Sequence, residues 1–376
     1  MGSVRKAPRS GRWEARYRDP GGSQRTATFD KKGDAVAFLA ATETSVNTGA
    51  WLDPSLGRTP FAAVAAEWLA SNGAKKATTY ARDAMVIRVH LNPFLADLPL
   101  SRIKPAHVKA VVAAMTTERD LAPATVRTNY GVLRAILSWA VDNDLLDRTP
   151  ARGVRLPELA PKSKSVVSAP AIEALADVIA LDYRVAVFLG AIGLRQAEVF
   201  GLRVGSVDFL RRTLTVRATT NEVNGRFVEG SGKTKTSTRT FSVPQRVLDE
   251  LAAHLARTGR TAPDDRVLQA PNGGPVRATN FRLRVYNPAL VRAGLEGLTF
   301  HRLRHSAGHM MREVGTPLEV IQQRMGHASI RTTADIYGSL PESVDRGVAD
   351  KLDGLFRGAC GADVVQPLPR SAERGE

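Results

Sequence analysis

Histidines and arginines near the end of the chain form its clearest chemical pattern. Four of the seven histidines fall between positions 301 and 327, and three of them stand in the stretch TFHRLRHSAGHMM. His301 and Arg304 are three residues apart, so a helix would present both side chains to one ligand. His305 and His309 continue the helical spacing and are interpreted as structural. A mixture of imidazole and guanidinium groups favours a pocket for a phosphate.

A metal centre is the alternative for the same stretch, because imidazoles four residues apart can bind zinc. The nearest carboxylate, Glu313, lies just past the cluster. The positive charges of Arg302 and Arg304 would repel a cation. The sequence therefore favours a phosphate and predicts no metal.

Two other stretches hold groups that could act on a phosphate. In AIGLRQAEVFGL, Glu198 follows Arg195 by three residues and could fix the guanidinium in place, although such pairs are usually surface ion pairs. In QQRMGHASIRTTADIYGSL, Tyr337 follows His327 by ten residues. An isolated tyrosine near a helix is ordinarily an amphipathic surface residue, so the residues alone leave its role open.

The stretch GSGKTKTSTRTFSVP, residues 230–244, begins like a nucleotide-binding loop. Such a loop needs a glycine five residues before its Gly-Lys pair and runs from a strand into a helix. Position 227 is Phe227, and the residues after the lysines are β-like. We therefore reject an ATP site and expect Lys233 and Lys235 on a hairpin or extended turn.

Taken in order, an arginine, a lysine hairpin, His-x-x-Arg, Gly-His and a tyrosine resemble the tyrosine recombinases, most closely the integrases of temperate phages. The motifs are GLRQAEVFGL, KTKTSTRTFSVP, HRLRH and MGHASIRTTADIYG, within about residues 170–350. Arg302 replaces an acidic residue that is frequent in the family, and Met325 replaces a leucine. Neither position has an assigned catalytic role.

The resemblance implies a role for each residue of the set. Tyr337 would attack a DNA phosphodiester, giving a 3′-phosphotyrosine link and a free 5′-hydroxyl. Arg195 and Arg304 would stabilise the phosphorane. Lys233 would protonate the leaving 5′-oxygen, and His301 would take the tyrosine proton.

The remaining positions support that chemistry. His327 fills the family's His/Trp position, and Glu198 matches an acidic position that orients the pocket. Lys233 is preferred to Lys235 because its distance to Arg239 matches the family's pattern. Because the phosphotyrosine link retains the energy of the broken bond and arginines stabilise the charge, the resemblance implies no ATP, no metal and no other cofactor.

The composition indicates a polyanionic partner. The formal net charge is +16 and the pI about 10.4, which suits nucleic acid or an acidic membrane surface. The sequence shows no apolar run of membrane-spanning length and no leader, so we expect a cytoplasmic protein without a membrane partner. With Cys360 as its single cysteine, the chain cannot form a disulfide framework.

Apolar periodicity predicts a multidomain α+β protein with four parts. Over residues 1–55 the sequence predicts a small three-stranded sheet plus a helix. This part resembles an arm-type DNA-binding domain. Residues 60–155 predict a helical domain, which resembles a core-DNA-binding domain. Residues 165–357 predict a mainly helical catalytic domain with a small antiparallel sheet, including strands over 213–217 and 239–243. Residues 358–376 predict a flexible tail.

Basic residues outside the catalytic motifs are candidates for DNA contacts. Residues 1–32 hold nine Lys and Arg against three acidic residues. A solvated basic surface is the alternative. The candidates are Arg16, Arg18, Arg25, Arg127, Arg134, Lys162, Lys164 and Lys235.

The resemblance implies a site-specific recombinase that integrates and excises a mobile genome in a bacterial host. Its partners would be double-stranded DNA with core-type and arm-type attachment sites, a homotetramer on that DNA, a host DNA-bending factor and an excisionase. An amphipathic helix carrying Val344, Val348, Leu352 and Phe356 would dock into a neighbouring subunit or pack on its own domain. The alternatives are a chromosome or plasmid resolution recombinase, an inactive DNA-binding regulator and a metal-dependent nuclease.

Overall fold

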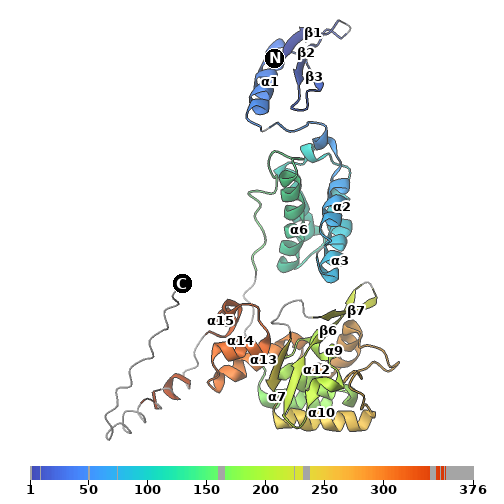
Figure 1. Ribbon diagram of the computed structural model, residues 1–376, viewed down its shortest axis with the longest axis vertical. Helices are drawn as coiled ribbons and strands as arrows, with labels where there is room; N and C mark the ends of the chain where they lie inside the picture. Colours follow the sequence, from blue (N-terminus) through green and yellow to red (C-terminus); the bar gives the residue numbers. More distant parts are fainter. Residues whose placement is uncertain are drawn as a thin grey trace, which may run out of the picture. The chain divides into compact units, whose positions relative to one another are not determined.

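The computed structural model of the chain divides into two compact units, Met1–Lys162 and Ser163–Glu376 (Figure 1). The structure describes residues 2–8, 10–49, 51–73, 75–159, 166–223, 225–231, 238–338, 344–347, 349–350 and 352. The division of the first unit into two domains, residues 1–55 and residues 60–155, stays a prediction from the sequence.

The first unit begins with a three-stranded antiparallel sheet in the order β1-β2-β3, as predicted. The strands are β1 (Ser3–Lys6), β2 (Trp13–Arg18) and β3 (Gln24–Phe29), and α1 (Lys32–Asn47) follows them. Tyr17 of β2 and Phe29 of β3 both pack on Phe38 of α1, with ring centroids 5.9 and 5.1 Å apart. The alternation of β2 therefore buries one face against α1.

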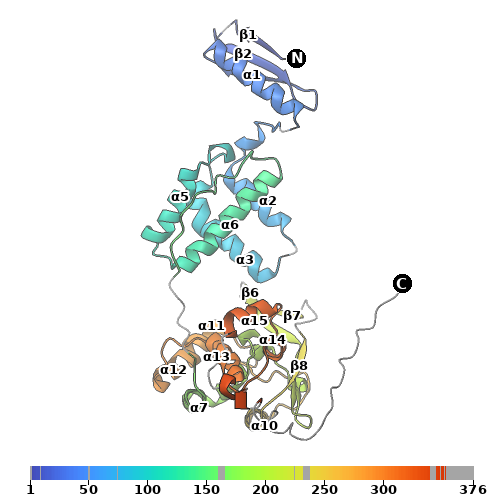
Figure 2. The ribbon, with the colours of Figure 1, turned by 90° about the vertical axis from the view of Figure 1, so that its left-hand side faces the viewer.

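The rest of the first unit is helical. Its elements are η1 (Leu56–Arg58), α2 (Phe61–Ser71), α3 (Ala77–Val86), η2 (Ile87–Leu91), α4 (Asn92–Leu95), η3 (Leu100–Arg102), α5 (Pro105–Ala113), η4 (Ala114–Glu118) and α6 (Pro123–Asp142). Figure 2 shows α2, α3, α5 and α6 in one view.

The two apolar stripes that the sequence predicts form the core of this helical part. All nine residues are buried: Phe61, Val64, Ala65 and Trp68 of α2, and Val126, Tyr130, Leu133, Ile136 and Leu137 of α6. Tyr130 also donates its hydroxyl hydrogen to the Ala151 carbonyl, 3.0 Å away, so its polar tip is satisfied inside the core. The helical periodicity of these stripes is confirmed.

The second unit is mixed. Its helices are α7 (Ala169–Val178), η5 (Leu181–Tyr183), α8 (Arg184–Ala191), α9 (Gln196–Gly201), η6 (Val204–Ser206), α10 (Gln245–Thr258), α11 (Ala278–Asn280), η7 (Phe281–Tyr286), α12 (Asn287–Ala293), α13 (Phe300–Glu313), α14 (Leu318–Met325) and α15 (Ile330–Tyr337). Its strands are β4 (Val207–Asp208), β5 (Thr213–Val216), β6 (Ala218–Val223), β7 (Arg226–Ser231) and β8 (Arg239–Ser242).

The two predicted strands are confirmed as β5 and β8, which pair antiparallel with Leu214 opposite Phe241. Between them lies the β6–β7 hairpin, in the segment where the sequence predicts a hairpin or extended turn but no separate strands. Strand β6 reads ATTNEV, whose central residues are polar, so it lacks the alternation that marks a half-buried strand. Among the described residues, β6 and β7 pair only with each other. Side-chain contacts from the body of the unit must therefore hold this hairpin in place.

The core of the second unit gathers around α8 and α13, which pack directly on each other. Phe300 of α13 meets Phe281 and Tyr286 edge-on, with centroids 5.9 and 5.7 Å apart. Helices α13, α14 and α15 contact one another and lie together in Figures 1 and 2. The helix predicted beyond Tyr337 is described only at residues 344–347, 349–350 and 352, and Val348 and Phe356 lie outside the described residues.

A prediction for the helical part compares two neighbouring residues of α6. Leu133→Ala should lower the free energy of unfolding by about 2–5 kcal/mol, because it removes a fully buried side chain and leaves a cavity. Arg134→Ala, on the exposed face, should change it by less than about 0.5 kcal/mol. All four tryptophans (Trp13, Trp51, Trp68 and Trp139) lie in the first unit, so urea unfolding followed by tryptophan fluorescence reports this unit. Equal losses in both variants would contradict the assigned helix face.

Candidate active site

A buried carboxylate, Glu198, lies at the centre of the site. It is in the first turn of α9, and its side chain is 4% exposed. The extended backbone of Arg195, the residue before α9, lets its N–H donate to Glu198 Oε2 at 2.8 Å. Arg195 Nη1 donates to Glu198 Oε1 at 2.9 Å. The spacing in the sequence therefore produces a capped helix start and an ion pair together.

A second arginine, Arg239, holds the same carboxylate from the first residue of β8. Its Nη1 and Nη2 atoms donate to the two oxygens of Glu198 at 3.0 and 2.8 Å, and its side chain is 5% exposed. The sequence motifs assign Arg239 no role beyond its spacing from the lysine. The missed signal is its register, because Arg239 and Phe241 alternate onto the buried face of β8.

These donors set the ionisation of Glu198. Burial by itself raises the pKa of this carboxyl, but the hydrogen bonds and charge of Arg239, followed by those of Arg195, lower it to about 2. Glu198 is therefore a carboxylate throughout the physiological range.

Arg304 of α13 is the third guanidinium of the site, and its side chain is 2% exposed. It donates to the carbonyl oxygens of Gly193 and Met325, and its Nη1 lies 3.9 Å from Glu198 Oε2. Burial, and then the positive charge of Arg195, lower the pKa of Arg304 to about 9, so it stays a cation at neutral pH.

Two glycine-containing loops supply the carbonyls that orient the arginines. Arg195 Nη2 donates to the Gly326 carbonyl at 2.9 Å, and Gly193 accepts from Arg304. Gly326 has a φ of +62°, and a Cβ built there would lie 2.9 Å from a nitrogen of Arg239. A side chain at this position would therefore strain the backbone and displace a buried guanidinium.

Tyr337 ends α15 and points into a pocket of imidazoles. The residue is 1% exposed, and its hydroxyl lies 3.3 Å from His305 Nδ1. The ring of His309 meets it edge-on with centroids 5.1 Å apart, and that of His327 lies parallel at 6.4 Å. Burial raises the pKa of Tyr337 to about 12, so the phenol is protonated at neutral pH.

Gly308 makes the space for this ring. A Cβ built there would lie 2.3–2.7 Å from atoms at the hydroxyl end of Tyr337. At the other end, Arg312 Nε donates to the Tyr337 carbonyl at 3.1 Å. Helix α13 thus contacts both the hydroxyl end and the backbone of the tyrosine.

The other two predicted histidines occupy different environments. His327 Nδ1 shares a hydrogen bond of 2.9 Å with the Thr333 hydroxyl. Burial, and then the charge of Arg304, lower the pKa of His327 to about 4, so it is neutral above that pH. His301, in the first turn of α13, is exposed and meets His305 edge-on, with centroids 4.7 Å apart. His305 and His309, which the sequence interprets as structural, both contact the tyrosine.

The structure thus brings together Arg195, Glu198, Arg304, His327 and Tyr337 and places His301 beside them through His305. The predicted lysines Lys233 and Lys235 lie outside the described residues, as do Lys162 and Lys164.

Three arginines of the second unit hold the hairpin that precedes the lysines in the chain. Arg203 Nη2 lies 2.8 Å from Glu229 of β7, and Arg266 pairs with the same carboxylate. Arg277 pairs with Glu222 of β6. These ion pairs supply the contacts that the two-stranded hairpin requires.

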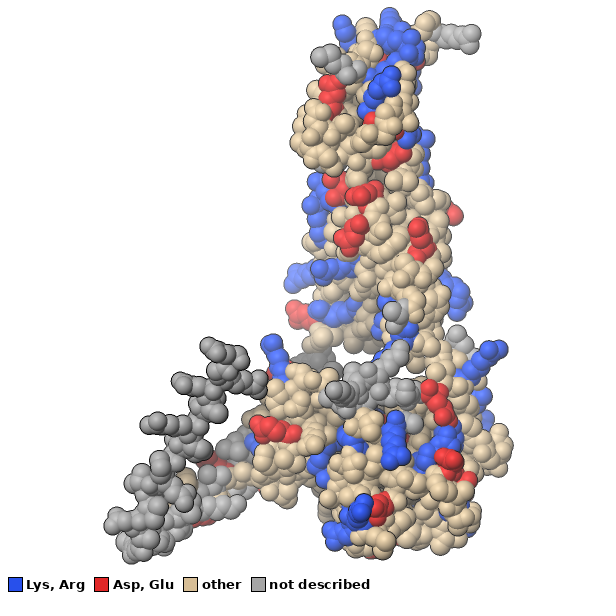
Figure 3. All heavy atoms as spheres, viewed as in Figure 1, with Lys and Arg blue, Asp and Glu red and all other residues tan. Residues whose placement is uncertain are grey.

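The predicted DNA-binding arginines of the first unit divide into two groups. In the sheet, Arg16 pairs with Glu14 at 3.2 Å, and Arg25 pairs with Asp19 and Asp53 at 3.0 and 2.8 Å. Arg18 donates to the Gly22 carbonyl. On α6, Arg127 and Arg134 are exposed, and Arg127 donates to the Pro157 carbonyl. Figure 3 shows Lys and Arg side chains spread over the visible face among fewer Asp and Glu.

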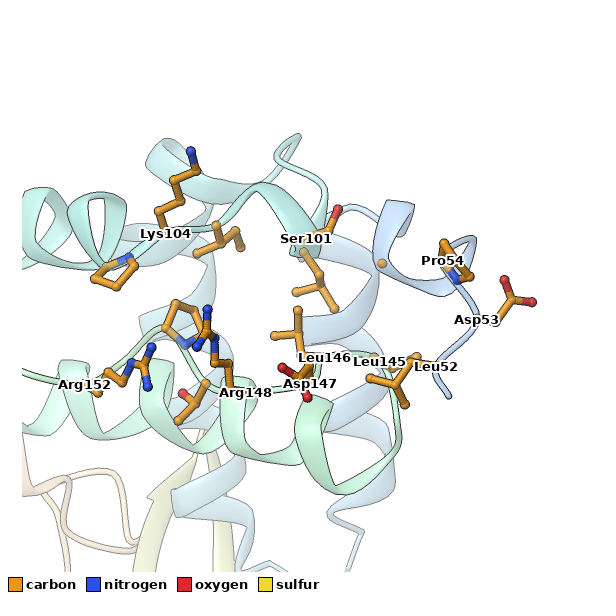
Figure 4. A pocket seen from close by; sticks show the side chains of 16 residues that line it. Leu52, Asp53, Pro54, Ser101, Lys104, Leu145, Leu146, Asp147, Arg148 and Arg152 are labelled. Atoms are coloured by element: carbon orange, nitrogen blue, oxygen red, sulfur yellow. The ribbon is translucent and has the colours of Figure 1, made fainter. Parts of the chain in front are cut away.

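The described residues line hollows both beside the site and away from it. One of about 470 Å³ is lined by His301, Gln196 and Arg282, beside the start of α13. Another, of about 530 Å³, lies in the first unit and holds none of the predicted site residues. Figure 4 shows Arg148 and Arg152 toward one end of it and Asp53 toward the other.

Within the part of the chain that the structure describes, three or more His, Cys, Asp or Glu side chains nowhere converge as a metal would require. Over the same residues, every helix is too short or too polar to cross a membrane.

A prediction concerns the charge of Glu198. Glu198→Gln should lower the free energy of unfolding by about 3 kcal/mol at pH 7, because it leaves Arg239 buried without its anion. The pKa falls from 4.5 in the unfolded chain to about 2 in the folded one. The stabilisation is therefore complete above about pH 4.5 and is lost as the pH falls toward 2. Calorimetry from pH 2 to 7 should show a steeper loss of stability toward low pH in the wild type than in the variant.

Glu173→Gln is the matched control, because Glu173 pairs with Arg246 and both side chains are nearly half exposed. We expect a change below about 1 kcal/mol. A loss as large as that of Glu198→Gln would show that burial does not determine how much an ion pair contributes to the free energy of unfolding.

Three family models match separate segments of the chain. Residues 171–342 match the phage integrase family, residues 1–48 the phage integrase N-terminal domain, and residues 61–156 the phage integrase central domain. The integrase of Mycobacterium phage D29 is 28% identical over 372 residues, which cover 94% of this chain and 96% of that protein. A XerC-like tyrosine recombinase of Caldanaerobacter subterraneus is 27% identical over 260 residues, 62% of this chain and 66% of that protein.

Solved structures share the fold. The Tn1549 transposon integrase in complex with transposon right end DNA aligns with a TM-score of 0.66 and 18% identity, over 78% of this chain and 100% of that one. A lambda integrase tetramer bound to a Holliday junction aligns with a TM-score of 0.53 and 15% identity, over 87% and 95%. With the family models matching from residue 1 to residue 342, the chain belongs to the phage integrase family and is a site-specific recombinase of the tyrosine type.

Proposed function

We propose that this recombinase integrates and excises a phage or other mobile genome at DNA attachment sites, through a covalent 3′-phosphotyrosine intermediate. The observation that carries the proposal is the charge of the pocket. Three guanidinium groups, Arg195, Arg239 and Arg304, share one carboxylate, Glu198. The pocket therefore keeps an excess of positive charge, which an anionic phosphodiester would offset.

The arginines differ in their access to a substrate. Arg239 and Arg304 are buried, whereas the Arg195 side chain is 42% exposed. Arg195 would contact the phosphate directly from its fixed position on Glu198. Arg304 would add positive charge from within the pocket, and its donors would turn to the phosphorane oxygens as charge develops there. His327, a neutral imidazole, would donate to the same phosphate.

The reaction exchanges one phosphate ester for another. The Tyr337 oxygen forms a bond to phosphorus while the bond from phosphorus to the 5′-oxygen breaks. The tyrosine proton passes to a histidine of α13, for which the sequence names His301, and Lys233 gives a proton to the leaving 5′-oxygen. Rejoining reverses these transfers, so neither ATP nor a metal is consumed.

The same proposal predicts how the recombinase assembles on its DNA sites. Core-type sites would meet the helical part of the first unit and the second unit, and arm-type sites the N-terminal sheet. A homotetramer would form on the DNA through the residues after Tyr337. A host DNA-bending factor and an excisionase would set the direction in the bacterial cytoplasm.

The first test uses a suicide DNA substrate nicked near the crossover of the element's own attachment core, in EDTA. The wild type should form a covalent protein–DNA adduct, and Tyr337→Phe should form none, because it lacks the attacking oxygen. Denaturing gel electrophoresis separates the adduct from free DNA.

Each other outcome would assign a different nucleophile, mechanism or function to this protein. An adduct in Tyr337→Phe would mean that another residue is the nucleophile. Cleavage that EDTA abolishes would indicate a metal-dependent nuclease. A shifted band without an adduct from either protein would indicate a DNA-binding regulator.

A second test identifies the general acid. Lys233→Ala should slow cleavage by about 100-fold or more, because the leaving 5′-oxygen loses its proton donor. A substrate with sulfur in place of that bridging oxygen should restore the rate, since a thiolate leaves without protonation. Lys235→Ala is the matched control and should slow cleavage of the oxygen substrate much less. The reverse order of the two variants would assign the role to Lys235.

A further inference from the structure

We propose that His305 is the group that accepts the proton of Tyr337, and that His301 passes this proton on to solvent. The inference rests on the proposed phosphotyrosine mechanism. It changes one assignment made from the sequence, in which His301 acts on the tyrosine directly and His305 only supports the fold.

The first observation is the contact with the reacting oxygen. Tyr337 Oη lies 3.3 Å from His305 Nδ1. The hydroxyl can donate to this nitrogen when the imidazole is neutral with its proton on Nε2. The distance is long for such a bond, which is common before a substrate tightens the site.

The second observation is the place of His305 on α13, between Arg304 and Gly308. Arg304, the preceding residue, is anchored to the carbonyls of Gly193 and Met325. Gly308, three residues further along α13, leaves the space that the tyrosine ring fills. The same turns of helix α13 therefore hold both the imidazole and the pocket for the phenol.

His327, whose imidazole lies parallel to the ring, fits the role less well. His327 shares its Nδ1 with the Thr333 hydroxyl, and its pKa of about 4 makes it a weak base. His309 meets the tyrosine ring edge-on, with centroids 5.1 Å apart.

His301 extends the path outward. Its ring meets that of His305 edge-on, with centroids 4.7 Å apart, and it is exposed on α13. The imidazole of His301 therefore lies between His305 and water. It can take a proton from His305 and release it to solvent.

The step balances as follows. The tyrosine O–H proton moves to His305 Nδ1 as the bond from the tyrosine oxygen to phosphorus forms. The bond from phosphorus to the 5′-oxygen breaks, and Lys233 protonates that oxygen. The His305 imidazolium then loses a proton through His301 to solvent. In rejoining, His305 regains a proton from solvent through His301 and gives one from Nδ1 to the released tyrosine oxygen.

The test measures single-turnover cleavage of the nicked attachment-core substrate by the full chain. His305→Asn keeps an acceptor oxygen near the Nδ1 position but cannot take a proton. We expect it to slow cleavage by about 100-fold or more. His309→Gln loosens packing on the same ring and should slow cleavage less than about tenfold. Equal melting temperatures and equal DNA binding would show that each variant is folded.

Two further readouts separate proton transfer from packing. The wild-type rate should rise with pH to a plateau as His305 becomes neutral, and His305→Asn should lack that rise. The substrate with a bridging 5′-sulfur should rescue Lys233→Ala and should not rescue His305→Asn, because the defect lies on the attacking side.

The proposal fails if His305→Asn cleaves within tenfold of the wild type, keeps the rise with pH, or is rescued by the sulfur substrate. A larger loss in His301→Asn than in His305→Asn would return the role to His301. Failure of the phosphotyrosine mechanism is a separate result, because it would appear as an adduct in Tyr337→Phe or as none in the wild type.

Discussion

The buried carboxylate of Glu198 is the constraint on which the second unit's site depends. Taking a charge out of water costs several kcal/mol unless opposite charges and hydrogen bonds replace the water. Arg239 and Arg195 supply that replacement, and Arg304 lies 3.9 Å away. Because these arginines come from β8, the start of α9 and α13, one carboxylate joins three segments that are distant in the sequence.

The glycine loops extend this constraint to the backbone. The carbonyls of Gly193, Met325 and Gly326 accept from Arg304 and Arg195, so the loops before α9 and after α14 lie against the guanidinium groups. The second loop leads through His327 into α15, which ends at Tyr337. The position of the tyrosine therefore depends on the arginines through a short and continuous path.

The tyrosine and the imidazole of His327 beside it are both uncharged at neutral pH. Burial raises the pKa of Tyr337 to about 12, and His327 is neutral at physiological pH. A protonated phenol is a weak nucleophile and needs a base at the moment of attack. A phosphate between Arg195 and Tyr337 would offset the positive charge of the pocket and bring the attacked atom to the phenol.

The sequence by itself determined the local features of this protein, because these depend on short-range periodicity. The buried stripes of α2 and α6, strands β5 and β8, the three-stranded N-terminal sheet and the pairing of Arg195 with Glu198 across one helical turn all follow from spacing. Only the tertiary structure decided which distant groups meet. It brought Arg239 onto Glu198 across 41 residues and His305 onto Tyr337 across 32. Such contacts depend on how whole elements pack, and no spacing within either segment encodes them.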